Sequence, residues 1–169
     1  KVTGIPSLGK GEYEVFVFAD YFCPPCKRID TKAEPLFKEL LTSEKVKLIF
    51  IDVPFARSTP IYAKYYLYAF NANSSVNNIL HARKILFDAA QTKRIQKEDD
   101  LVAYLKEQQI TVKIMDEKSV FPLLSLVIKK YKVNQTPTCV IKYSDTSVKK
   151  YIGEDEIWNG LTELKAYLK

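Results

Sequence analysis

The chain has 169 residues, enough for one domain with a substantial core or for a core domain that carries an insertion. Its 26 basic and 20 acidic residues give a net charge of +6, but the lysines are scattered without interleaved aromatic residues, which favours a solvated basic surface over a nucleic-acid interface. No run approaches the roughly 18 consecutive apolar residues of a transmembrane helix, and three cysteines are too few for a disulfide scaffold.

Two apolar runs in the first third of the chain predict buried strands with a helix between them. Residues 14–19 and 46–53 are rich in Val, Phe and Ile and alternate little, which is typical of central strands. Apolar residues at helical spacing predict a helix over residues 24–41. Its expected inward face consists of Ile29, Ala33, Leu36, Phe37, Leu40 and Leu41.

The middle of the chain, from residue 58 to about 112, lacks strand patterns and shows helical periodicity instead. Polar segments interrupt this periodicity at residues 71–75 and again at 93–97. The pattern predicts three helices, at residues 61–69, 76–90 and 100–108.

The last third of the chain predicts a helix, a hairpin and a final helix. Helical spacing covers residues 116–132, and the polar residues 144–146 are a hairpin signal between two short predicted strands at 139–143 and 147–152. An amphipathic helix follows from about Asp155 to the end.

The order of these elements predicts an α/β fold with a helical insertion. Strand–helix–strand is followed by the helical segment and then by helix–strand–strand–helix. We expect residues 1–57 and 114–169 to form one domain and residues 58–113 to form an inserted helical subdomain.

The residues Cys23-Pro24-Pro25-Cys26 stand where the first strand ends and the first helix begins. Two cysteines at this spacing can close a small disulfide ring, and the helix N-terminus stabilises the thiolate released when the ring opens. Cys23 is therefore the expected nucleophile, and Cys26, one turn into the helix, the resolving thiol. The two prolines cost the first helical turn little, but they remove two N–H donors from the Cys23 thiolate.

A metal-binding pair and two unreactive buried thiols are the competing interpretations of Cys23 and Cys26. A zinc site needs about four ligands, but the only histidine, His81, and the third cysteine, Cys139, are both distant in the sequence. Cys139 lies in a predicted strand, where we expect a buried, unreactive thiol. The favoured interpretation is a redox site that needs neither a metal nor a cofactor.

Two segments resemble the thioredoxin superfamily, and more closely its Dsb branch. Residues 18–27, FADYFCPPCK, look like the active-site segment of DsbA-, DsbC- and DsbG-like proteins. The triplet Thr136-Pro137-Thr138 lies at the start of a strand, where the superfamily has a cis-proline beside its two cysteines. The resemblance covers nearly the whole chain and implies a thioredoxin fold with a helical insertion.

The chain also departs from these relatives in three respects. Only 22 residues precede Cys23, whereas DsbC and DsbG proteins carry an N-terminal dimerisation region. Pro25 stands where DsbA proteins usually have His, and Val17 stands where thioredoxins have a buried acid. The loss of this His, together with the two N–H donors that the prolines remove, leads us to expect that Cys23 is less acidic, and its disulfide less oxidising, than in a protein with a CPHC sequence. The loss of the buried acid at Val17 argues against an ordinary thioredoxin proton relay.

Further residues are expected to shape the site. A cis bond at Pro137 would expose backbone groups of Thr136, with which an extended substrate chain could pair. Asp20 is expected to cap the helix or hold the loop, or else to tune Cys23 electrostatically. Tyr21 and Phe22 are expected to form an apolar rim for unfolded substrates, although Phe22 could equally pack in the core.

The first functional interpretation is an exported bacterial thiol–disulfide oxidoreductase, located in the periplasm. Its partners would be protein thiols and disulfides and a redox protein that resets the site, which could be membrane-bound. The first eleven residues lack the pattern of a secretory signal, so a cytoplasmic redox protein remains a less favoured interpretation. Two further functions fit the same residues: an isomerase or reductase that is kept reduced, and a chaperone-like binding module.

Overall fold

The computed structural model describes residues 4–169, in which four strands and six helices follow the predicted order. Most boundaries lie within one or two residues of the prediction. In chain order the elements are β1 (Tyr13–Ala19), α1 (Pro24–Thr42), β2 (Val46–Asp52), α2 (Thr59–Ala72), α3 (Val76–Gln91), α4 (Glu98–Glu107), α5 (Glu117–Lys130), β3 (Thr138–Lys142), β4 (Val148–Ile152) and α6 (Glu154–Tyr167).

The sheet brings together two segments that are far apart in the sequence. Its strand order is β2-β1-β3-β4, with β1 parallel to β2 and antiparallel to β3. Phe18, near the end of β1, is paired with Thr138 at the start of β3. The loop that follows β1 and the loop that precedes β3 therefore meet at the same end of these two central strands.

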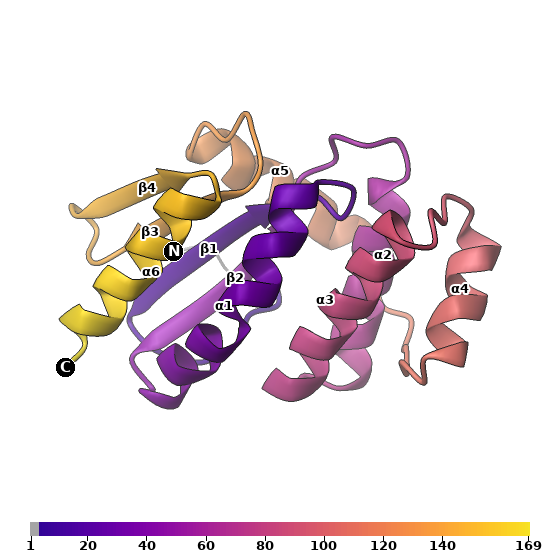
Figure 1. The fold of residues 1–169 in the computed structure, drawn as a ribbon, viewed down its shortest axis with the longest axis horizontal. Coiled ribbons are helices and arrows are strands. Elements are labelled where there is room, and N and C mark those ends of the chain that lie inside the picture. The colour runs from indigo at the N-terminus through magenta and orange to yellow at the C-terminus, as the bar shows by residue number, and fades with distance from the viewer. Residues whose placement is uncertain (1–3) are drawn as a thin grey trace.

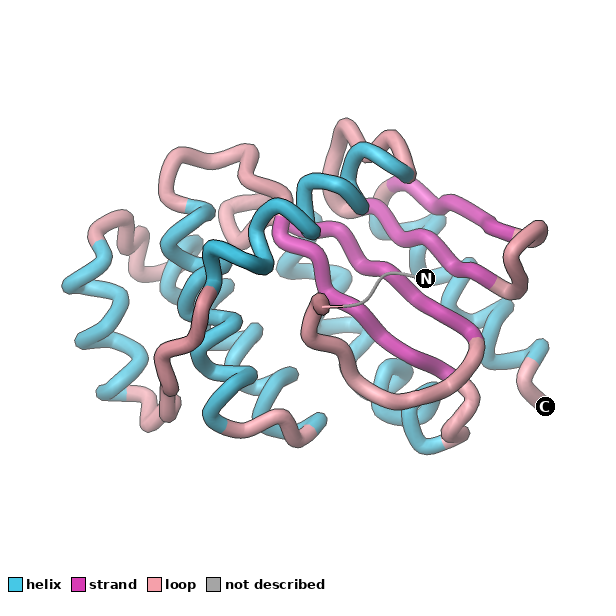
Figure 2. Tube along the Cα trace, turned by 180° about the vertical axis from the view of Figure 1, so that it is seen from behind, coloured by secondary structure: helices cyan, strands magenta, loops and turns pink. Residues whose placement is uncertain are grey.

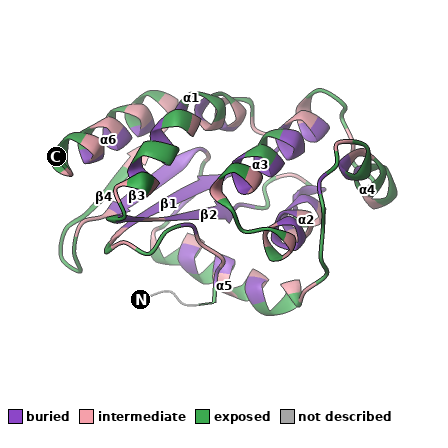
Figure 3. Cartoon of the chain, turned by 90° about the horizontal axis from the view of Figure 1, so that it is seen from below, coloured by how far each residue is buried: buried purple, intermediate pink, exposed green. Residues whose placement is uncertain are grey.

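Helices cover both faces of this sheet. Helices α1 and α6 lie on one face and α5 lies on the other (Figure 3). Seen from behind, α5 crosses over the strands (Figure 2). Helices α2, α3 and α4 lie to one side of the sheet, with α4 outermost (Figure 1).

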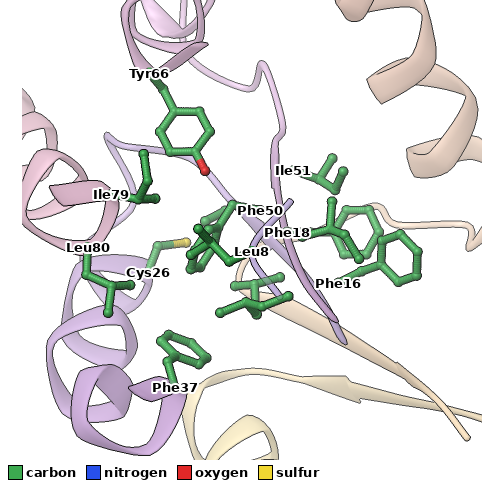
Figure 4. Packing of buried hydrophobic residues seen from close by; sticks show 14 of the residues in the cluster. Leu8, Phe16, Phe18, Cys26, Phe37, Phe50, Ile51, Tyr66, Ile79 and Leu80 are labelled. Carbon is green, nitrogen blue, oxygen red and sulfur yellow. The ribbon is translucent and has the colours of Figure 1, made fainter. Parts of the chain in front are cut away.

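One buried cluster extends from the sheet into α2, α3 and α4. Neighbouring residues of a strand point to opposite faces, so Phe50 packs toward Phe37 and Ile79 while Ile51 lies with Phe18 on the other side (Figure 4). Because both faces are covered, β1 and β2 are apolar at nearly every position, which explains the weak alternation of their sequences.

Helices α2 and α4 each begin two residues earlier than predicted. Helix α2 begins at Thr59 and continues to Ala72, and Pro60 fits its first turn because a proline there gives up no helical hydrogen bond. Helix α4 begins at Glu98, and its acidic first turn is favourable beside the positive end of the helix dipole. No helix within residues 4–169 is both long and apolar enough to cross a membrane.

The contact between α1 and β2 predicts a large loss of stability on truncation. Phe37 is 1% exposed and its ring meets Phe50 edge-on, with 5.6 Å between the centroids. Phe37→Ala should lower the free energy of unfolding in urea by about 3–5 kcal/mol, because it leaves a cavity. The same substitution at Phe55, which is 56% exposed, should change it by less than about 0.5 kcal/mol. Equal losses in the two variants would contradict this description of the core.

Candidate active site

Cys23 and Cys26 form a disulfide across the first turn of α1, with 5.2 Å between their Cα atoms. Cys26 is 1% exposed and packs in the core (Figure 4). Cys23 is half-buried, so its sulfur is the more accessible of the two. An incoming thiol can therefore reach Cys23 and not Cys26.

Cys23 is also the N-cap residue of α1. Its backbone is extended, and its Sγ accepts a hydrogen bond from the backbone N–H of Cys26 at 3.3 Å. Pro24 and Pro25 fill the two positions between them and have no N–H to donate. The N–H of Cys26 is thus the first one in the helix that can stabilise a thiolate on Cys23, together with the helix dipole.

The loop before β3 lies directly beside Cys23. The peptide bond between Thr136 and Pro137 is cis, and the carbonyl oxygen of Thr136 is 3.6 Å from the Sγ of Cys23. The carbonyl of Pro137 accepts a hydrogen bond from the N–H of Gly153 at 3.0 Å, and the hydroxyl of Thr138 donates to the carbonyl of Gln135 at 2.8 Å. The first bond attaches the loop to the residue before α6, and the second closes the turn before β3.

Asp20 connects two loops by hydrogen bonds and does not cap α1. The N-cap residue of that helix is Cys23. The carboxylate of Asp20 accepts hydrogen bonds from the hydroxyl of Thr59 at 2.7 Å and from the N–H of Ala56 at 3.1 Å. A third bond comes from the N–H of Phe22 at 3.2 Å. The prediction of a helix cap is therefore wrong, and the loop role that it was paired with is the one observed.

The predicted apolar rim is wrong for Tyr21. Its side chain is 1% exposed, and its ring packs against Phe87 and Tyr62 with centroid distances of 4.9 and 5.7 Å. Helices α2 and α3 supply these rings, and burial raises the pKa of the Tyr21 hydroxyl. Phe22 is half-buried and meets Tyr62 edge-on at 5.0 Å, so it packs against the core.

The two basic residues after Cys26 are each paired with a carboxylate. The ammonium of Lys27 lies 2.9 Å from Asp88, and the guanidinium of Arg28 lies 3.0 Å from Glu154. These carboxylates partly neutralise the charges of Lys27 and Arg28, which weakens their electrostatic effect on Cys23.

Sequence reasoning missed a buried ionic group next to the site. Arg83 is 1% exposed, and its Nη2 and Nε lie 2.8 and 2.9 Å from a carboxylate oxygen of Asp30. Its guanidinium also stacks on Phe50, 3.7 Å from the ring centroid. Asp52 is buried at the end of β2, where burial raises its pKa to about 7 although the charge of Arg83 opposes the rise. The one available signal was a charged residue on an otherwise apolar face of α3.

Cys139 does not take part in this arrangement. It lies fully buried in β3, opposite Val17 of β1, and burial raises the pKa of its thiol to about 12. Such a thiol is protonated and inaccessible at neutral pH. Within residues 4–169, His, Cys, Asp and Glu side chains nowhere gather in a group that could hold a metal ion.

A family model described as "Thioredoxin" matches residues 9–157. The chain belongs to this thioredoxin family. The fold and the superfamily predicted from residues 18–27 and 136–138 are therefore confirmed. Among curated proteins, none matches the chain by sequence.

Solved structures share the thioredoxin fold of this chain at low sequence identity. A Wolbachia pipientis α-DsbA1 structure has a TM-score of 0.70 at 19% identity, covering 99% of this chain and 94% of that one. A periplasmic thioredoxin-like protein from Salmonella enterica serovar Typhimurium has a TM-score of 0.66 at 21% identity, with coverages of 94% and 88%. The catalytic domain of Proteus mirabilis ScsC has a TM-score of 0.66 at 20% identity, with coverages of 94% and 87%.

The raised pKa of Asp52 predicts how stability depends on pH. Between about pH 4 and 7 the folded protein keeps a proton on Asp52 that the unfolded chain releases, so the free energy of unfolding should fall as the pH rises. Asp52→Asn should reduce this fall by about 1.4 kcal/mol for each pKa unit of the shift. Part of the slope should persist, because burial also raises the pKa of Asp30.

Urea unfolding at several pH values between 4 and 8 measures this dependence, with Glu44→Gln, at an exposed position in the turn after α1, as the control. The control should reproduce the wild-type pH profile. An unchanged profile in Asp52→Asn would show that Asp52 is ionised throughout this range.

Proposed function

We propose that this protein is a thiol–disulfide oxidoreductase that exchanges disulfides with protein substrates through Cys23 and Cys26. The observation that carries the proposal is the accessible Sγ of Cys23 at the N-terminus of α1, with Cys26 buried behind it and Thr136 at its side. This arrangement supplies an accessible sulfur, a stabilised leaving thiolate and a backbone surface for the substrate.

The exchange requires only the two sulfur atoms of the disulfide. A substrate thiolate attacks the Sγ of Cys23, the bond to Cys26 breaks, and Cys26 leaves as a thiolate that takes up a proton. A second substrate thiolate then attacks the substrate sulfur of the mixed disulfide, and Cys23 leaves as a thiolate. The substrate has lost two electrons to the protein. In the reverse direction Cys23 attacks a substrate disulfide, and Cys26 resolves the mixed disulfide.

The substrate chain is proposed to lie along Thr136 and Pro137 in an extended conformation. The carbonyl of Thr136 reaches within 3.6 Å of the Cys23 Sγ, so a strand paired there would carry its own cysteine to the disulfide. Pro24 is exposed and Pro25 is half-buried, and both are proposed to border the substrate chain beside the disulfide.

An apolar groove continues from this loop and is proposed to receive substrate side chains. Residues 53–55 form one wall, and the end of α5 with residues 132–134 forms the other. Phe55 is exposed here, and the next residue, Ala56, is bonded to Asp20 of the site loop. This groove takes the role that sequence analysis gave to Tyr21, and it also supports a chaperone-like module as the second candidate function.

The proposed function also includes the cellular location of the protein and the partner that sets the direction of disulfide exchange. We propose an exported, periplasmic protein, because a structure of similar fold is described as a periplasmic thioredoxin-like protein. A redox partner, which could be membrane-bound, would then reset the site. An isomerase or reductase kept in the reduced form would use the same residues.

We also propose residues 58–113 as an inserted helical subdomain within the domain formed by 1–57 and 114–169.

Cysteine variants separate the proposed roles. Cys26→Ser should accumulate a mixed disulfide with a peptide that contains one disulfide, because Cys23 can attack but nothing resolves the adduct. Cys23→Ser should form no adduct and should exchange disulfides only at the background rate. Cys139→Ala is the control and should keep wild-type exchange, because that thiol is buried away from the site and the substitution introduces no polar group into the core.

Mass spectrometry of the adduct and the rate of peptide reduction in glutathione buffer give the readouts. Full exchange activity in Cys23→Ser would refute the proposed function. If Cys23→Ser lost disulfide exchange but still suppressed the aggregation of an unfolded protein, the result would favour a chaperone-like function in addition to disulfide exchange.

A further inference from the structure

Gln91, the last residue of α3, contacts the redox segment through its side chain. Its Nε2 donates hydrogen bonds to the carbonyl oxygens of Tyr21 and Cys23, each at 2.9 Å. Both partners can only accept, so the NH₂ of the amide is the group that fits here. A half-buried side chain of the helical segment is thus bonded to the backbone on both sides of Phe22.

These two hydrogen bonds restrain the residue that carries the reactive sulfur. The carbonyl of Cys23 also accepts the first helical hydrogen bonds of α1, from the N–H groups of Cys26 at 3.1 Å and Lys27 at 3.2 Å. The direction of the Cys23 side chain follows from its backbone, which has φ −98° and ψ 112°. Fixing the carbonyls of Tyr21 and Cys23 therefore keeps the Sγ of Cys23 beside the N–H of Cys26.

The same end of α3 binds a residue on the other side of the disulfide. Asp88 lies 2.9 Å from the ammonium of Lys27, and the hydroxyl of Thr92 accepts a hydrogen bond from that ammonium at 3.3 Å. Helix α3 packs beside α1 (Figure 1). The end of α3 is therefore attached to the segment on both sides of Cys23 and Cys26.

We propose that Gln91 is a positioning residue for the redox site, through which the helical segment sets the stability of the Cys23 thiolate and the reduction potential of the disulfide. The effect of a helix N-terminus falls off within its first turn, so a small displacement of the sulfur weakens it. A less stable thiolate disfavours the reduced form and makes the disulfide less oxidising. This inference rests on the proposed function of the same site.

The test removes the two hydrogen bonds without changing charge. Gln91→Met keeps the volume of the side chain, and Gln91→Asn keeps the amide but is too short to reach both carbonyls. In the reduced protein both variants should raise the pKa of Cys23, measured by thiolate absorbance against pH. They should also shift the equilibrium with glutathione toward the disulfide by about 3- to 10-fold, where tenfold corresponds to about 30 mV.

A third variant reverses the hydrogen-bonding character at the same place. Gln91→Glu places a carboxylate against two carbonyl oxygens and adds negative charge near the sulfur. Its shift in the pKa of Cys23 should exceed that of Gln91→Met. Gln108→Met is the matched control, since Gln108 is another half-buried glutamine of the helical segment, at the end of α4, and it should leave both quantities unchanged.

The outcomes separate this inference from the function on which it rests. If the wild-type protein exchanges disulfides and both Gln91→Met and Gln91→Asn keep its thiol pKa and its equilibrium constant within twofold, the positioning role is refuted and the function stands. A loss of stability without a change in these two quantities likewise assigns Gln91 to folding alone. If Gln91→Met does not fold, Gln91→Asn decides. A wild-type protein without exchange activity refutes the proposed function, whatever the pKa values of the variants.

Discussion

The hydrogen bond from the backbone N–H of Cys26 to the Sγ of Cys23 is the interaction on which the site depends. It makes a cysteine the N-cap of α1 and places the more accessible sulfur at the positive end of the helix. Because Pro24 and Pro25 offer no N–H groups, the stabilisation of a thiolate rests on few donors. A site built in this way is sensitive to any contact that moves the sulfur away from the helix axis.

The rest of the fold holds this interaction in place from three directions. The antiparallel pairing of β1 with β3 brings Thr136 beside Cys23, although 113 residues separate them. Asp20 attaches the loop after β1 to the start of α2, and Gln91 attaches it to the end of α3. The helical segment between β2 and α5 is therefore bonded to the site loop by two separate side chains, and it forms one continuous core with the sheet.

The sequence predicted those features that depend on local spacing. Helical periodicity located α1, α3 and α5, and the cysteine spacing at a strand–helix junction located the disulfide. The surroundings of the site could not be read in this way, because they depend on which segments meet in space. Tyr21 follows a polar residue in a predicted loop, and only the packing of α2 and α3 shows that it is buried. The Arg83–Asp30 pair and the contacts of Gln91 join residues 53 or more positions apart.

The equilibrium constant of the Cys23–Cys26 disulfide with glutathione tests the central claim most directly. One backbone donor and no imidazole beside Cys23 should leave the thiolate only moderately stabilised. We therefore expect a reduction potential clearly more negative than about −120 mV, the value for DsbA. A potential at or above about −120 mV would contradict the account, because it would require a thiolate stabilised by groups other than the N–H of Cys26 and the dipole of α1.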